Sequence, residues 1–153
     1  MIKCTDMVEE KTILLTIAYD GTGFSGWQRQ PNARTVCGEL ERILSSVLGF
    51  PLELFGASRT DAGVHARGQS ASFSGMMGIP AGGILRAVND ALSPSRLECA
   101  GEIRIVSAEE RPSGFHARYD SRGKRYSYRI RNAKEPDLFL RNYCYQIAEP
   151  LNE

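Results

Sequence analysis

The alternation of side chains over residues 13–19 predicts a β-strand. One set of side chains, from Ile13 to Tyr19, is apolar, and the intervening set is largely apolar as well. Because both faces would then be covered, we expect this strand to lie centrally in a sheet. Residues 1–11, which precede it, are largely polar and predict a loose leader.

Two later segments repeat apolar side chains at the spacing of a helix. Residues 36–48 do so between Thr35, a favourable N-cap, and Gly49, a favourable C-terminal stop. The second segment begins at Pro80, which suits the first position of a helix, and its apolar stripe continues to Leu92. We expect each helix to bury its stripe against a sheet.

Three further strands are predicted between and after these helices. They cover residues 52–57, 69–74 and 97–106, with a turn at 75–78 and an irregularity near Gly101. The order strand, helix, strand, strand, helix, strand is the split βαβ, ferredoxin-like pattern, which RNA-recognition modules also use. The sequence therefore predicts an α+β fold, a βαββαβ sheet with two helices on one face.

A different pattern begins after this domain, which we place at residues 12–110. In residues 111–153, a strand is predicted over 125–131, with aromatic and apolar side chains on one face and mostly basic ones on the other. A polar loop over 132–141 and a short strand over 143–146 follow.

Composition restricts the class of protein. The chain has 153 residues, of which 42% are hydrophobic and 24% are charged, as expected for one globular domain. No apolar run is long enough to span a membrane and no signal-peptide pattern is present, so we expect a cytoplasmic protein.

The cysteines and histidines do not form a metal-binding pattern. The four cysteines are scattered, without C-x-x-C spacing, and predict free thiols in a reducing compartment. His65 and His116 are the only histidines and belong to no Cys/His pair of ligand spacing. We therefore expect no metal site. The cysteines are Cys4, Cys37, Cys99 and Cys144.

Basic residues are concentrated in one segment, although the net charge of the chain is only +1. Residues 111–131 hold seven Lys or Arg against one acid, Asp120, which is a local charge of +6. Such a run can be a solvated face. Here the charges are interleaved with tyrosines, a mixture that suits backbone phosphates and stacked bases.

A glycine-rich loop follows the first strand. Residues 21–26 match G-x-G-x-x-G, but a dinucleotide fingerprint must open a helix, and Pro31 forbids one here. We therefore reject a dinucleotide site and expect the glycines to shape a loop that presents Trp27, Gln28 and Arg29. A core anchor is an equally good interpretation of Trp27.

The polar stretch over residues 57–69 is expected to form a loop between two strands, where side chains can be presented to a ligand. Arg59 and Asp61 lie two apart within it, and Gly63 permits a sharp turn. One interpretation is a turn closed by a local Arg59–Asp61 ion pair. An aspartate-dependent hydrolase would need a second carboxylate or a metal in this loop, and neither is seen.

Four motifs, in order, resemble the tRNA pseudouridine synthase A family. The strongest is Arg-Thr-Asp-Ala-Gly-Val-His-Ala at 59–66. The others are Tyr-Asp-Gly-Thr at 19–22 with Gly-Trp-Gln-Arg-Gln at 26–30, Phe-His-Ala-Arg at 115–118, and Arg-Tyr-Ser-Tyr at 125–128. The resemblance runs from about Ile13 to the end of the chain.

The chain departs from this family in two ways. Ser58 stands where many members have glycine, which keeps a small residue. The family also has a second, C-terminal half, and residue 153 falls about where that half would begin. The resemblance therefore implies an N-terminal half with the pseudouridine synthase fold.

The resemblance also implies a reaction, the isomerisation of uridine to pseudouridine on the 3′ side of the anticodon loop and adjoining stem of tRNA. It implies no cofactor and no metal. Asp61 would be the essential catalytic carboxylate. Tyr126 would stack on the displaced uracil, and Arg59 would enter the space that the displaced nucleotide leaves. The alternative is a catalytically inactive RNA-binding module.

Other residues receive supporting roles. Phosphate and RNA contacts are expected from the basic segment and the glycine-rich loop, and loop support from residues around Asp61. The partners implied are tRNA and, in the full-length family members, a second copy of the chain. The RNA-binding candidates are Arg118, Arg122, Lys124, Arg125, Gln28 and Arg29, and the support candidates are Gly63, His65, Arg67 and Gln69.

Overall fold

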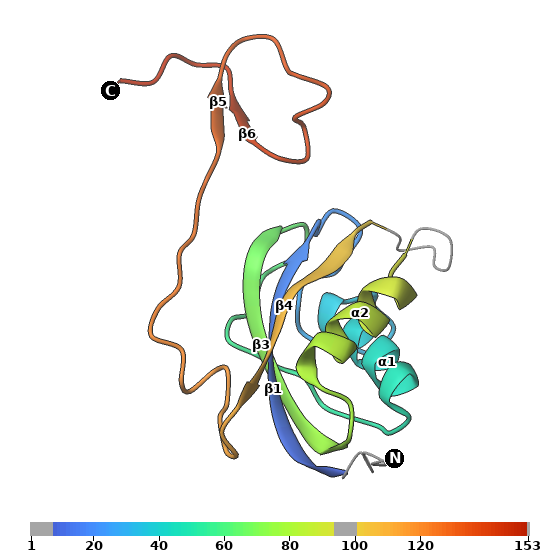
Figure 1. The fold of residues 1–153 in the computed structure, drawn as a ribbon. Helices are drawn as coiled ribbons and strands as arrows, with labels where there is room; N and C mark the ends of the chain where they lie inside the picture. Colours follow the sequence, from blue (N-terminus) through green and yellow to red (C-terminus); the bar gives the residue numbers. More distant parts are fainter. Residues whose placement is uncertain (1–7, 94–100, 153) are drawn as a thin grey trace. The chain divides into compact units, whose positions relative to one another are not determined.

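The computed structural model describes residues 8–93 and 101–152. By their internal contacts these form two compact units, divided between Arg122 and Gly123. The first unit contains a four-stranded sheet and two helices, and the second contains two short strands (Figure 1). The first unit reaches past the predicted domain end at residue 110, because residues 111–122 pack with it.

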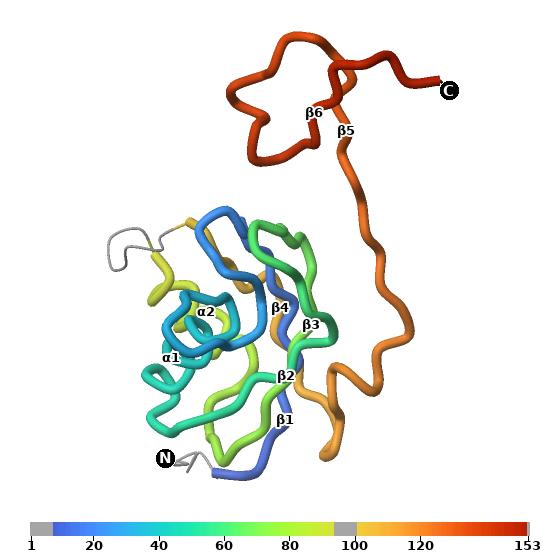
Figure 2. The backbone as a smooth tube through the Cα atoms, turned by 180° about the vertical axis from the view of Figure 1, so that it is seen from behind, coloured from blue at the N-terminus to red at the C-terminus, as the bar shows by residue number. Residues whose placement is uncertain are grey.

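The sheet of the first unit has the strand order β2-β3-β1-β4, and each neighbouring pair is antiparallel. β1 has a partner on both sides, which confirms the predicted central strand (Figure 2). Both helices lie on one face of the sheet (Figure 1). The predicted α+β arrangement is therefore confirmed. The elements are β1 (Glu9–Tyr19), α1 (Val36–Leu48), β2 (Phe55–Gly56), β3 (Ala66–Met77), α2 (Ala81–Ala91) and β4 (Ile103–Arg111).

Helix α1 begins and ends where the sequence predicted. The Thr35 hydroxyl accepts a hydrogen bond from the Gly38 N–H at 3.3 Å, so one of the free amides of the first turn is satisfied. Gly49 closes the helix at φ 80°, and its N–H donates to the Ser45 carbonyl.

Helix α2 starts one position later than predicted, because Pro80 is its N-cap in an extended conformation and not its first helical residue. The helix is attached to β4 through Asn89, whose side chain donates to the Ile105 carbonyl and accepts from the Ile105 N–H. These bonds satisfy the backbone beside a bulge, where β4 shifts register against Thr16 and Ile17.

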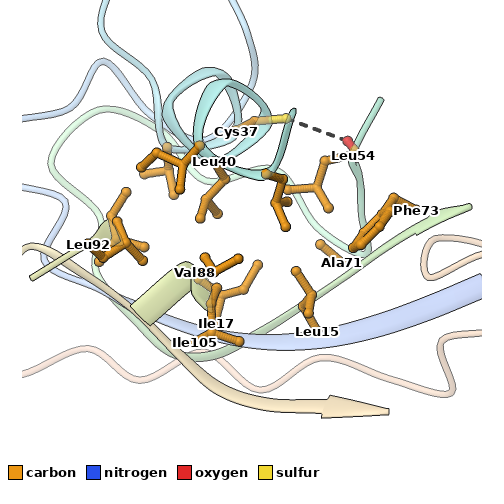
Figure 3. Packing of buried hydrophobic residues seen from close by; sticks show 14 of the residues in the cluster. Leu15, Ile17, Cys37, Leu40, Leu54, Ala71, Phe73, Val88, Leu92 and Ile105 are labelled. Carbon is orange, nitrogen blue, oxygen red and sulfur yellow. Dashed lines mark hydrogen bonds between the residues drawn. The ribbon is translucent and has the colours of Figure 1, made fainter. Parts of the chain in front are cut away.

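The core lies between the helices and the sheet (Figure 3). Alternate residues of β1 point toward the helices, as the period of a strand requires. Cys37 of α1 belongs to the same cluster, and its Sγ donates to the Leu54 carbonyl. Burial raises the pKa of the Cys37 thiol to about 12. Other buried members are Leu15, Ile17, Leu40, Ala71, Phe73, Val88, Leu92 and Ile105.

Several strand boundaries differ from the sequence prediction. β1 begins at Glu9, inside the predicted leader, and β3 continues through residues 75–77, which were predicted as a turn. The reason is pairing, since Glu9 lies opposite Met77 and their hydrogen bonds form whatever the polarity of the side chains. β2, in contrast, contains only two residues. Positions 97–100 of the predicted fourth strand lie outside the described residues.

The second unit contains β5 (Ile130–Asn132) and β6 (Tyr145–Ile147), which pair in parallel. The strand predicted over residues 125–131 forms only from Ile130 onward. The Arg129 carbonyl still accepts the Tyr145 N–H of β6 at 2.8 Å. Over the described ranges no strand pairs with residues 125–128, and an extended segment without a partner has no ladder of hydrogen bonds. Tyr126 and Tyr128 are exposed there.

The remaining composition-based expectations concern thiols and helices. Cys37 and Cys144 are free thiols, as predicted, whereas Cys4 and Cys99 lie outside the described residues. Neither α1 nor α2, the helices of the described ranges, has the length and apolar character needed to cross a membrane.

Candidate active site

The loop between β2 and β3 is fixed through its backbone. The Thr60 carbonyl accepts a hydrogen bond from the Trp27 N–H at 3.0 Å, and the Gly63 N–H donates to the Phe24 carbonyl at 3.4 Å. At the start of the loop, the Ala57 N–H donates to the Ser70 carbonyl at 2.8 Å. The polar loop is therefore attached to the glycine-rich loop that follows β1.

Two glycines make this attachment possible. Gly26 has φ 87°, and a Cβ placed on it would lie 2.6 Å from the Thr60 carbonyl oxygen. A Cβ on Gly21 would overlap the Val64 carbonyl oxygen. The glycines of the G-x-G-x-x-G match thus allow two backbones to approach each other. The sequence showed the spacing of these glycines but not the backbone that they approach, which belongs to the loop between β2 and β3.

Trp27 is a core anchor, which decides between its two interpretations. Its side chain is 2% exposed, and its ring lies against Gly56, where an added Cβ would come within 2.5 Å of the indole nitrogen. The Tyr19 ring packs beside it, with 5.9 Å between the ring centroids. Gln28, the next residue, remains at the surface.

Side chains at residues 59–61 of the loop alternate between the solvent and the interior of the first unit. Thr60 points inward, where its hydroxyl shares a hydrogen bond of 2.8 Å with the hydroxyl of the buried Tyr19. Its two neighbours, Arg59 and Asp61, are exposed. The Val64 N–H then donates to the Asp61 carbonyl, which closes a turn with a positive φ at its third residue, as in type II turns.

Arg59 and Asp61 line one hollow of about 330 Å³. Within residues 8–93 and 101–152 their side chains form no ion pair with each other, so the alternative interpretation of a local Arg59–Asp61 ion pair is wrong. A carboxylate and a guanidinium on a fixed backbone are therefore both available to a ligand. The other lining residues are Ser25, Gln28, Gln30, Thr60 and Ala62.

His65 holds the far end of the loop, and Gln69 of β3 holds its start at Ser58. His65 Nδ1 lies 3.1 Å from the Gly21 nitrogen and 3.0 Å from an Asp20 carboxylate oxygen. The Gly21 N–H donates to this ring nitrogen. The buried Gln69 side chain donates to the Ser58 carbonyl. The contact between Asp20 and His65 was not predicted from the sequence.

Arg29 is engaged in structural contacts. Its guanidinium forms an ion pair of 2.9 Å with Glu41 of α1 and a longer one of 3.7 Å with Glu53. Glu41 is 7% exposed and also accepts the Leu54 N–H at 2.9 Å. A buried carboxylate requires such partners. The RNA-binding role of Arg29 stays a prediction.

Arg118 lies near Arg59 at the surface of the first unit. Both line a second hollow of about 170 Å³, together with Gln28 and Phe55. Arg118 is placed by its neighbour Ala117, which is buried and whose N–H donates to the Ser72 hydroxyl of β3 at 2.9 Å. The other predicted phosphate contacts follow in the chain, Arg122 in the first unit and Lys124 and Arg125 in the second.

The structure groups the candidate residues in part. Gln28, Arg59 and Asp61 meet at one hollow of the first unit, and Tyr126 belongs to the second unit, where it is 59% exposed. Among the residues that the structure describes, no three His, Cys, Asp or Glu side chains are grouped so that they could hold a metal ion.

Fold and site together define a class, a ferredoxin-like α+β domain that presents one exposed carboxylate on a loop between antiparallel strands. A family model described as tRNA pseudouridine synthase matches residues 15–120. The chain therefore belongs to the tRNA pseudouridine synthase family.

Curated relatives carry the name tRNA pseudouridine synthase A. One from Caldicellulosiruptor bescii is 44% identical over 142 residues, which is 93% of this chain and 55% of the relative. One from Halalkalibacterium halodurans is 41% identical over 143 residues, 93% of this chain and 52% of the relative. The chain thus spans about half the length of the curated relatives it matches.

Proposed function

We propose that this chain is the catalytic half of an enzyme that isomerises uridine to pseudouridine in the anticodon stem-loop of tRNA. The observation that carries the proposal is the placement of Asp61. Its side chain is exposed in a hollow, while the backbone on both sides is held by Trp27, Val64 and the Tyr19–Thr60 bond. A rigid backbone with a free functional side chain is the arrangement that catalysis requires.

The proposed reaction is balanced within the substrate. The bond between C1′ of the ribose and N1 of the uracil breaks, the base rotates, and C1′ joins C5. C5 then loses its proton, and N1 ends with one. Asp61 can act as a nucleophile or as a base in this sequence, since a carboxylate is suited to either task.

Arg59 and Tyr126 are proposed to assist displacement of the target base, Arg59 by filling its place in the helix and Tyr126 by stacking on the uracil. A stacked uridine must leave its helix, which costs a few kcal/mol. The planar guanidinium of Arg59, unpaired with Asp61, can stack in the space the base vacates. The Tyr126 ring, exposed in the second unit, offers a flat surface for the uracil.

The proposed RNA contacts use the local positive charge. Arg118, Arg122, Lys124 and Arg125 would bind backbone phosphates, and Gln28 would contact RNA from the lining of the first hollow. A homodimer, as the resemblance implies for full-length members of the family, stays a prediction.

Release of tritium from C5-labelled uridine in tRNA tests the proposed activity. We expect the complete product of the gene to release tritium, because C5 loses its proton whenever C1′ joins it. Binding of tRNA without any release would reject the catalytic proposal and favour the alternative, an RNA-binding module.

The 153-residue chain assayed alone is expected to bind tRNA and to release little tritium. Asp61 is exposed and its hollow is open, so water would surround the carboxylate and weaken the electrostatic preorganisation that such chemistry depends on. Release at the rate of the complete gene product would show that these residues suffice.

Neutralising the basic segment should weaken binding of tRNA by the chain. We expect the combined change of Arg122, Lys124 and Arg125 to Gln to flatten the salt dependence of binding, by about 0.7 to 0.9 in log–log slope for each phosphate that is no longer neutralised. Titrations at several salt concentrations measure this slope.

A matched control removes the same charge elsewhere. Arg42, Arg86 and Lys134 are also exposed, and changing them to Gln should leave the slope unchanged. Equal slopes for both triple variants would identify the basic segment as an ordinary solvated surface.

A further inference from the structure

Three aromatic rings form a stack on the first unit. The His116 ring lies between Phe55 of β2 and Tyr119, with 4.7 Å and 4.4 Å between the ring centroids. The interplanar angles are 39° and 35°. Phe55 pairs in register with Ser72 of β3, so the stack begins at the sheet.

The segment that carries the outer rings is held in place. Ala117, at its centre, is buried and bound through its N–H to the Ser72 hydroxyl. The His116 N–H donates to an Asp120 carboxylate oxygen at 2.7 Å, and the Tyr119 N–H donates to the His116 carbonyl at 3.1 Å. The rings are thus presented by a fixed backbone.

Tyr119, the outermost ring, is 77% exposed although one of its faces lies on His116. Its other face is therefore open. Phe55, at the inner end, is 38% exposed and lines the second hollow with Arg59 and Arg118. In the described part of the chain the Arg118 guanidinium forms no ion pair, in contrast to that of Arg29.

We propose that the Phe55–His116–Tyr119 stack is a second RNA contact, a platform on which one unpaired base of the tRNA stacks, with Arg118 binding an adjoining phosphate. The proposal rests on the proposed function, and it adds a subsite outside the hollow of Asp61. The stack has an open face on Tyr119 at its outer end, and the Arg118 guanidinium lines the hollow beside Phe55 at its inner end. Together they match an unpaired nucleotide, which offers a flat ring and an anion.

Binding of an anticodon stem-loop RNA by the 153-residue chain tests this platform. We expect Tyr119→Ala to weaken binding about ten-fold, as the loss of one base–aromatic stack does, with the salt slope unchanged. Tyr119→Phe keeps the ring and should bind as the unmodified chain does. Phe139→Ala, which removes an aromatic ring that is 89% exposed elsewhere, serves as the control.

Two further binding measurements separate the contribution of base stacking from that of charge. Arg118→Gln should lower the salt slope by about 0.7 for a contact to single-stranded RNA. On a fully paired RNA duplex without a loop, Tyr119→Ala should have no effect, because no unpaired base is present. Thermal unfolding checks that the exposed Tyr119 can be replaced without loss of the fold.

The outcomes are distinct. If the unmodified chain binds the stem-loop and Tyr119→Ala binds it equally well, the platform is rejected and the proposed function is untouched. If Tyr119→Ala weakens binding to the stem-loop and to the duplex by the same factor, stacking of an unpaired base is rejected. If the unmodified chain binds no RNA, the platform is rejected together with the RNA-binding role of the chain.

Discussion

Asp61→Asn is expected to abolish the release of tritium from C5-labelled tRNA by the complete gene product, a loss of about a thousand-fold or more. The substitution preserves the shape of the side chain and removes its charge, so the group can neither attack carbon nor accept a proton. Affinity for tRNA should stay within a few-fold, because the proposed phosphate contacts lie elsewhere in the chain.

The stability of the Asp61→Asn variant should match that of the unmodified protein. The Asp61 side chain is exposed and forms no ion pair with its neighbour Arg59, and its carbonyl, which closes the turn with Val64, is unchanged. Asp90→Asn makes the same change at another exposed aspartate, on α2, and should keep full activity. Undiminished release by Asp61→Asn would remove Asp61 from the catalytic step.

Gly26→Ala is expected to lower the free energy of unfolding by about 2 to 4 kcal/mol and to reduce turnover by about a hundred-fold. The positive φ costs about 1 to 2 kcal/mol for a residue with a Cβ. The added methyl would also lie 2.6 Å from the Thr60 carbonyl, which must then move. A shift of about 1 Å in a catalytic group can account for such a loss of rate.

Gly49→Ala separates the two contributions. Gly49 has a similar φ of 80° at the end of α1, but an added Cβ would meet nothing within 4 Å. We therefore expect only the conformational cost and normal turnover. Denaturant unfolding and tritium release on both variants measure the difference. If both variants had equally reduced activity, the close approach at Gly26 would have no part in holding the site.

The sequence alone determined the elements whose signals are local. The spacing of apolar residues and the caps Thr35 and Gly49 predicted α1 to the residue, because a helix is closed by hydrogen bonds between neighbours in the chain. The two apolar faces of residues 13–19 indicated a central strand. The motif around Arg59 and Asp61 indicated the family, and with it the loop that the structure places beside a hollow.

Tertiary structure decided what depends on residues far apart in the chain. Trp27 could be interpreted as a core or a surface residue until its contact with Gly56 was seen. The roles of Gly26 and Gly21 likewise depend on their distant neighbours Thr60 and Val64. The lengths of β1 and β3 follow from their mutual pairing, and the stack of Phe55 on His116 follows from the docking of a later segment on the sheet. Periodicity reports which side chains prefer burial, whereas the partner that buries them is chosen by the packing of the whole domain.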